Sequence, residues 1–196
     1  MSLFRGTPDI LSRQVGCWPG GVTATILGVS TLGLDPRHRA VYELAGFTMA
    51  HGLWFLSEGH RPLPMGAYVS ADRRGIVRFA DNPYERAIAQ ARRWFGSNAP
   101  GAQLSALLSE GRAWLSEGVR EALIADLAVY GVGPAGTVVL PLLATNSMRF
   151  TVQQPAINPA AELVPYVEEL AVAFERGLRG HERGNMVFEE ARAAMA

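Results

Sequence analysis

The sequence predicts an α+β fold: one mostly antiparallel sheet, made of a hairpin plus a three-stranded meander, with four main helices packed on it. Two observations lead to this prediction. An Asp or Asn stands directly before a proline three times, at Asp35-Pro36, Asn82-Pro83 and Asn158-Pro159, which is typical of a helix N-cap followed by the first helical residue. Between the helical segments lie apolar runs separated by short turn signals, which favours strands that run in opposite directions.

The four helices differ in how their apolar residues are arranged. We expect them at about Pro36 to Ser57, Asn82 to Ser97, Ala102 to Glu117 and Glu162 to Arg179. The first is apolar on nearly all sides, which predicts a central core helix or an interface helix. The others carry their apolar residues at spacings of three and four, so each is expected to bury one stripe.

The strand signals fall into two groups. Met65 to Ala71 and Gly75 to Ala80 flank a polar turn and predict a hairpin. The meander is expected at 122–130, 137–145 and 148–153. The segment Gly131 to Gly136 matches the Gly-x-Gly-x-x-Gly dinucleotide fingerprint, but β-branched residues and a proline follow it where that fingerprint needs a helix. We therefore predict a turn there and no nucleotide.

The chain is expected to divide into an uncharged Gly/Thr-rich arm or strand (1–35), a single α+β domain (36–180) and a short C-terminal helix or tail (181–196). Within the arm, residues 14–34 carry no charge and are long enough to span a bilayer. Pro19 and five glycines in that stretch weaken a spanning helix. We expect an arm that covers the core, and no membrane association.

Every one of the 18 basic side chains is an arginine. Because a guanidinium cannot form a Schiff base or act as a tunable amine, the sequence excludes imine-forming enzymes, pyridoxal phosphate on a lysine and the phosphate loop that ends in Gly-Lys-Ser/Thr. The single cysteine, Cys17, cannot form an internal disulfide, which favours a reducing compartment. The arginine-only usage is typical of a GC-rich genome, so we expect a bacterial cytoplasmic protein without a cofactor.

Three residues in His51-Gly-Leu-Trp-Phe-Leu-Ser-Glu58-Gly-His60 form the only close grouping of imidazoles and a carboxylate. Their spacing matches no known metal motif, so no metal is predicted. Asp126 lies in the middle of a predicted strand, where a buried carboxylate would need an arginine such as Arg149 or Arg78 as partner. A ligand or metal site of an enzyme or small-molecule binder, near His51, Glu58, His60 and Asp126, is the first alternative function.

Charge is unevenly distributed although the net charge is zero. Residues 61–93 carry seven Arg against three acidic residues, and residues 162–190 carry seven Glu against three Arg. We expect these opposite blocks to face each other, within one subunit or across a homodimer. Nucleic-acid binding through Arg73, Arg74, Arg78 and Arg93 is the second alternative and is less favoured, because the chain as a whole lacks a positive field. The leading hypothesis is a non-catalytic protein that acts through protein–protein contacts and self-associates.

Overall fold

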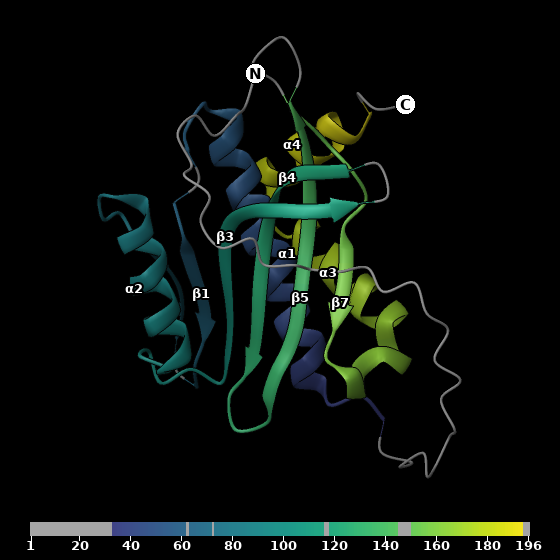
Figure 1. Ribbon diagram of the computed structural model, residues 1–196. Coiled ribbons are helices and arrows are strands. Elements are labelled where there is room, and N and C mark those ends of the chain that lie inside the picture. The colour runs from purple at the N-terminus through teal and green to yellow at the C-terminus, as the bar shows by residue number, and fades with distance from the viewer. Residues whose placement is uncertain (1–32, 62, 72, 116–117, 145–149, 194–196) are drawn as a thin grey trace.

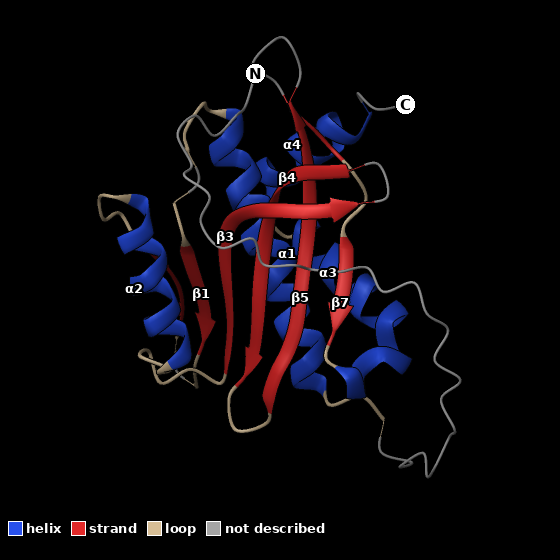
Figure 2. Cartoon of the chain, in the orientation of Figure 1, coloured by secondary structure: helices blue, strands red, loops and turns tan. Residues whose placement is uncertain are grey.

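The computed structural model describes residues 33–61, 63–71, 73–115, 118–144 and 150–193. The predicted α+β class is confirmed there: four α-helices accompany a seven-stranded antiparallel sheet (Figures 1 and 2). The elements are, in chain order, α1 (Pro36–Ser57), β1 (Met65–Val69), β2 (Arg74–Arg78), α2 (Tyr84–Gly96), β3 (Leu104–Leu115), β4 (Gly118–Val129), β5 (Gly133–Ala144), β6 (Phe150–Val152), β7 (Ala156–Pro159), a 3-10 turn (Ala161–Tyr166), α3 (Val167–Arg179) and α4 (Glu182–Ala193).

The sheet has the order β2-β1-β3-β4-β5-β6, and β7 pairs with β5 beside β6. Helix α1 runs behind the sheet, with α3 and α4 packed against it (Figure 1). Helix α2 covers the opposite face, because Leu107 of β3 packs with Ala87 and Ala91 of α2, whereas its neighbours Ala106 and Leu108 belong to the α1 core. Strand β3 is thus buried on both faces.

The predicted third helix, 102–117, is wrong: this segment forms β3, which pairs with β1 and β4. Its apolar residues occur at helical spacings because α1 covers one face of the strand and α2 the other, so both faces are apolar. A strand buried on two faces loses the simple alternation that would distinguish it from a helix.

The three Asx-Pro pairs behave differently. Asp35 caps α1 as predicted, with its Oδ1 accepting from the backbone N–H of Arg37 at 2.8 Å. At Asn82-Pro83, a cis peptide, Pro83 occupies the N-cap position and the helix begins at Tyr84. Asn158 and Pro159 end β7 instead of starting a helix, and α3 follows the 3-10 turn that contains Pro165. The helical prediction for 162–179 holds once this first turn is counted as 3-10 structure.

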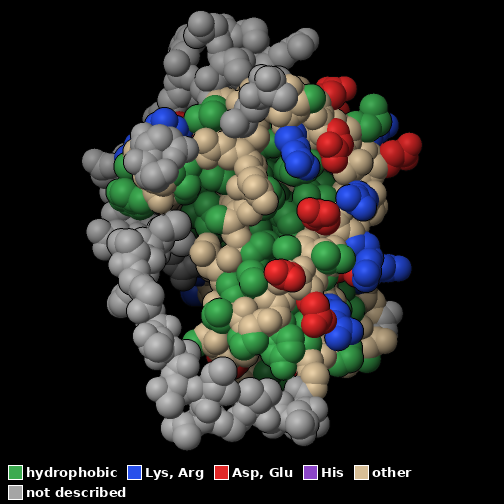
Figure 3. All heavy atoms as spheres, turned by 90° about the vertical axis from the view of Figure 1, so that its right-hand side faces the viewer, with side chains coloured by type: hydrophobic (Ala, Val, Ile, Leu, Met, Phe, Trp, Pro, Cys, Tyr) green, Lys and Arg blue, Asp and Glu red, His purple; other side chains and the backbone are tan. Residues whose placement is uncertain are grey.

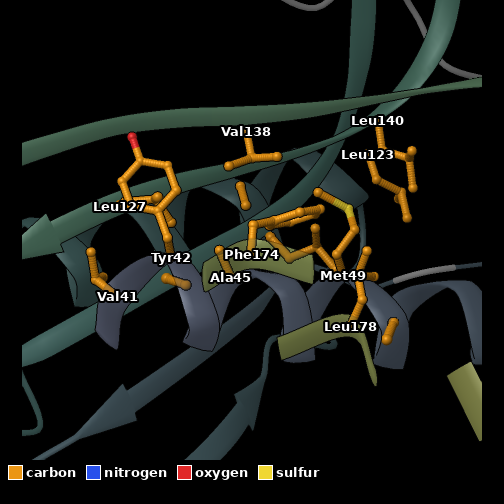
Figure 4. Close-up of a cluster of buried hydrophobic side chains, with 14 of the residues drawn as sticks. Val41, Tyr42, Ala45, Met49, Leu123, Leu127, Val138, Leu140, Phe174 and Leu178 are labelled. Carbon is orange, nitrogen blue, oxygen red and sulfur yellow. The ribbon is translucent and has the colours of Figure 1, made fainter. Parts of the chain in front are cut away.

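The main core lies between α1, α3 and the inner face of β4 and β5. Figure 4 shows α1 and α3 side chains converging below the strands: Val41, Tyr42, Ala45, Met49, Phe174 and Leu178 meet Leu123, Leu127, Val138 and Leu140. The buried Tyr42 hydroxyl points to the sheet and donates to the carbonyl of Ala135 at 2.9 Å. The prediction of a central core helix at 36–57 agrees with this packing.

Helices α3 and α4 approach α1 closely through glycines. A Cβ on Gly177 of α3 would lie 1.8 Å from the carbonyl oxygen of Glu43, and one on Gly46 of α1 would lie 2.0 Å from that of Phe174. Gly184 of α4 contacts the backbone of Ala50 in the same way. These glycines are needed because the helix backbones touch.

The Gly131 to Gly136 segment forms the β4–β5 hairpin, as the sequence predicts, with positive φ angles at Gly131, Gly133 and Gly136. Strand β5 continues past Pro141, which lies where the neighbour of β5 changes from β7 to β6.

Most of the predicted arm (1–32), with Cys17, lies outside the described residues. None of the helices in the described ranges combines the length and the apolar composition that crossing a bilayer requires.

Candidate functional site

A groove of about 510 Å³ separates α1 and α3 from the β1–β2 hairpin, and we call it the α1 groove. Apolar side chains of α1 and of both strands line it, and arginines stand on two of its sides. Its lining residues are Glu43, Leu44, Phe47, Ala67, Tyr68, Val69, Arg74, Gly75, Ile76, Arg176, Gly177 and Gly180. Arg74 comes from β2 and Arg176 from α3, and Glu43 of α1 is the acidic residue among the groove's lining residues.

An aromatic and imidazole cluster adjoins the groove through Phe47, whose ring lies 5.0 Å from that of His181. We call it the histidine cluster: Phe47, His51, Trp54, Phe55 and His181. His51 is central, because its ring lies within 5.1–5.5 Å of the rings of Trp54, Phe55 and His181. The α1 members recur every three or four residues, which places them on one side of the helix. His181 arrives from the α3–α4 junction.

The two imidazoles are hydrogen-bonded to each other. His51 Nδ1 lies 2.9 Å from His181 Nε2, and the backbone N–H of Gly184 donates to His181 Nδ1 at 3.1 Å. On the other side, Arg78 Nη2 lies 3.4 Å from His51 Nε2. Burial, reinforced by His181 and Arg78, lowers the pKa of His51 from 6.5 to about 4, and burial also lowers the pKa of His181. Both rings are therefore neutral at pH 7.

Two guanidinium groups lie over the aromatic rings of the cluster. Arg78 of β2 stacks on Phe55 at 4.3 Å, and Arg183 of α4 lies over Trp54 at 5.3 Å. With Arg74 and Arg176, four arginines border the surface formed by the α1 groove and the histidine cluster. Glu43 pairs with Arg176 at 3.5 Å, and Glu58 accepts from Trp54 Nε1 at 2.7 Å. The arrangement favours an anionic ligand with an apolar body.

Strand β2 forms one end of the sheet, and no other strand in the described part of the chain pairs with its outer edge. The backbone N–H of Ser70 donates to the carbonyl of Arg73, and that of Phe79 to the carbonyl of Pro64. By antiparallel alternation, residues 73, 75, 77 and 79 therefore bond to β1, and Arg74, Ile76 and Arg78 direct their N–H and C=O groups outward. Ile76 packs against the α1 core, so these three side chains share the groove side.

The predicted ligand-binding residues are only partly brought together. His51 is at the centre of the cluster, the ring of His60 lies 6.0 Å from that of Phe55, and Glu58 is bound to Trp54. Asp126 lies on the other face of the sheet, since it stands opposite Leu107 of the α2 face. Its candidate partner Arg149 lies outside the described residues, and Arg78 contacts His51 instead. In the described ranges no group of three or more His, Cys, Asp or Glu is placed to hold a metal ion.

The predicted arginine patch is divided by the sheet. Arg74 and Arg78 lie on the α1 side, and Arg73 lies next to them in the hairpin turn. Arg93 belongs to α2, which covers the opposite face. The structure therefore does not present these four arginines as one surface.

The two opposite charge blocks are not joined by any ion pair of the described residues. Acidic residues of α3 pair with Arg39 of α1 and with Arg179 of α3 itself. On the side where α3 and β7 lie, acidic and basic side chains are interspersed beside hydrophobic ones (Figure 3). A hollow of about 100 Å³ on α3, α4 and β7 is lined by both signs, including Glu175, Arg179, Glu189 and Arg192. The excess of arginine around the α1 groove thus distinguishes it from this surface.

A partly buried ion pair lies at the middle of β3. The Glu110 side chain, 4% exposed, accepts a two-pronged bond from Arg61 at 2.9–3.1 Å, and Arg61 stacks on Tyr84 at 4.0 Å. Burial raises the pKa of Glu110 to about 7, against the opposing effect of Arg61. This group holds α2 and the segment after α1 onto β3, and we assign it to structure.

Sequence reasoning finds His51, Arg74 and Arg78 but misses His181, Arg183 and Phe47. His181 is 130 positions from His51, and only the helix break before it marks it out. Comparison of the chain with protein-family models, curated proteins and solved structures finds no match to any of them.

Proposed function

We propose that this chain is a non-catalytic binding protein that holds an extended, acidic segment of a partner protein along β2 and over the α1 groove. The observation that carries the proposal is the outer edge of β2, which no described strand pairs with and whose residues Arg74, Ile76 and Arg78 border an apolar groove with further arginines beyond it. An extended segment that adds a strand to such an edge gains main-chain hydrogen bonds, and its alternate side chains reach the pockets beside the edge.

The spacing of the β2 side chains gives the chemistry of the segment. Residues 74, 76 and 78 lie on one face, so the partner presents a carboxylate, an apolar side chain and a second carboxylate at every other position. Opposite charges across neighbouring strands stabilise the pairing. The pattern is therefore Asp/Glu-x-apolar-x-Asp/Glu.

The same edge disfavours a second copy of this chain. If two β2 strands paired antiparallel with Ile76 opposite its copy, Arg74 of one would stand opposite Arg78 of the other. Like charges directly across a strand pair destabilise it. The expected self-association would thus need another surface, and the β2 edge suits a different, acidic protein.

The contacts of the histidines support a binding role over a catalytic one. Each imidazole bonds to the other, and their remaining contacts are with Arg78 and a backbone N–H. A general base in a nucleophile pair is oriented by a carboxylate or carbonyl that accepts from its ring, and His51 makes no such bond to the residues that the structure describes. We therefore favour binding.

The test uses a labelled peptide with the repeat Glu-x-Val-x-Glu, a matching peptide with Lys in place of Glu, and fluorescence anisotropy at low salt. We expect the acidic peptide to bind and the basic one not to. The charge-reversed double variant Arg74→Glu/Arg78→Glu should weaken binding of the acidic peptide by about tenfold and should bind the basic peptide instead, because each of the two exposed charge pairs contributes about 0.2–1 kcal/mol and reversal turns attraction into repulsion.

Two controls make the result specific to β2. Arg93→Glu changes the same charge on the opposite face of the sheet and should leave binding unchanged. Ile76→Pro removes an outward N–H while keeping both arginines, and should abolish binding. Equal binding of the acidic peptide to wild type and to the double variant would refute the proposal.

A further inference from the structure

The hydrogen bonds of the histidine pair fix where its protons lie. The backbone N–H of Gly184 can only donate, so His181 Nδ1, 3.1 Å away, carries a lone pair. A neutral His181 then carries its proton on Nε2 and donates it to His51 Nδ1 across 2.9 Å. A neutral His51 consequently carries its own proton on Nε2.

That nitrogen faces Arg78, which also can only donate. Arg78 Nη2 lies 3.4 Å from His51 Nε2, the longest of the three contacts in the chain. The three contacts, Gly184 to His181, His181 to His51 and Arg78 to His51, each require one acceptor. Each neutral imidazole supplies only one acceptor nitrogen, and Gly184 N–H and Arg78 supply none, so only two acceptors are present. Protonating either ring removes an acceptor and adds a donor, so it does not resolve the mismatch. Among the described residues, this series of contacts lacks one acceptor, and the place for it is beside Arg78 and His51.

An oxygen atom fits that place. Two nitrogens 3.4 Å apart can both donate to one oxygen at about 2.9 Å from each, or to the two oxygens of one carboxylate. Phe55 supports the flat face of the Arg78 guanidinium, which leaves its N–H edge available. Two further charged groups contact Trp54 of the cluster: Arg183, which lies over its ring, and Glu58, whose Oε1 already accepts from its Nε1.

We infer that His51 Nε2 and the Arg78 guanidinium form a binding site for an oxyanion, a carboxylate or a phosphate group, completed by the field of Arg183. In part this deepens the proposed function, since the acidic side chain opposite Arg78 would occupy the site. The proton arrangement itself holds for the free protein and can be tested without any peptide.

The first experiment is NMR of the ring nitrogens of ¹⁵N-histidine protein at pH 7, which distinguishes the two neutral tautomers. We expect His51 and His181 both to carry the proton on Nε2. A His51 proton on Nδ1 would overturn the inference, because Nε2 would then accept directly from Arg78 and no acceptor would be missing. This measurement uses the wild-type chain and so does not depend on a variant that folds.

The second experiment titrates the same protein with sodium acetate and, separately, with inorganic phosphate, against sodium chloride at equal ionic strength. We expect a saturable shift of the His51 Nε2 signal with at least one oxyanion and not with chloride. Stronger binding of acetate points to a carboxylate of a protein segment, and stronger binding of phosphate to a phosphoryl group. No saturable shift with either overturns the inference.

Variants separate this site from general attraction to arginine. Arg78→Gln should weaken oxyanion binding at least about tenfold. Arg93 is an exposed arginine of α2, so Arg93→Gln should leave oxyanion binding unchanged. Equal weakening by both would overturn the inference. The two proposals also fail differently. Free acetate binding without peptide binding refutes only the strand-addition function. Peptide binding that Arg74→Glu/Arg78→Glu abolishes, in a protein whose His51 Nε2 signal shows no saturable shift with either oxyanion, refutes only the oxyanion site.

Discussion

Gly177→Ala is the sharpest test of how α3 is held on α1. The new Cβ would lie 1.8 Å from the carbonyl oxygen of Glu43 and 2.9 Å from the backbone nitrogen of Phe47, and backbone atoms cannot rotate away. An ordinary carbon–oxygen contact needs roughly 3.4 Å, so the helices must separate by about 1.5 Å, which loosens Phe174 and Leu178 on either side.

Two opposing contributions set how much Gly177→Ala changes the free energy of unfolding. Overpacking a core costs about 1–3 kcal/mol, and a contact this short belongs at the upper end of that range. Alanine is a better helix former than glycine by about 1 kcal/mol, which offsets part of the cost. We expect a net loss of about 2 kcal/mol in the free energy of unfolding, or a fall of about 4–8 °C in Tm for a chain of this size.

The assay is urea unfolding followed by circular dichroism, with Gly96→Ala as the matched control. Gly96 is also a helical glycine, at the end of α2, but a Cβ there would meet nothing within 4 Å. We expect the control to be unchanged or slightly more stable. If Gly177→Ala unfolds at the same urea concentration as Gly96→Ala, the close packing of α3 on α1 is refuted.

Three further predictions concern buried polar groups. Tyr42→Phe removes the bond to the Ala135 carbonyl, which still accepts from the backbone N–H of Ala160 at 3.2 Å, so we expect a loss of about 0.5–1.5 kcal/mol in the free energy of unfolding; an unchanged midpoint in urea would contradict this. The pKa of Glu110 is raised to about 7 from 4.5, so its contribution to stability is complete below pH 4.5 and is lost as the pH rises through 7; Glu110→Gln should flatten that decline between pH 5 and 8. The pKa of His51 is lowered to about 4 from 6.5, so its contribution is complete above pH 6.5 and falls as the pH drops toward 4. His51→Phe should remove this acid-side decline, and an unchanged pH profile in either variant would refute the assigned shift.

The sequence predicts most elements whose signals are local. Helix α1 could be bounded to the residue because Asp35 caps it by a bond to the next turn. The β1–β2 and β4–β5 hairpins follow from their turn residues. Strand β3 could not be found in this way, because the spacing of its apolar residues depends on α1 and α2 covering opposite faces of the strand. That coverage is a property of the assembled fold.

The site shows the same division. His51, Arg74 and Arg78 stand out in the sequence by residue type, but what they do depends on His181, which reaches His51 only because glycines let α3 and α4 lie directly on α1. Asp126 does not join His51, because it lies on the face of the sheet that α2 covers. The alternation of side chains along a strand can be read from the sequence, but which face α1 covers cannot. Contacts between segments 130 positions apart leave no local pattern.

The composition of α1 connects the fold with the proposed site. The sheet covers one side of the helix and α3 and α4 a second, which accounts for its fully buried residues. It does not account for Phe47, Trp54 and Phe55, which lie half-buried on the remaining side. The rings on this side contact His181, Arg183 and Arg78, but a helix side outside the hydrophobic core is ordinarily polar, so large aromatic side chains at this position need another reason. Beside the β2 edge, which no described strand pairs with, and beside four arginines, we propose that this reason is a ligand whose apolar side chains rest on the rings while its carboxylates reach Arg74 and Arg78.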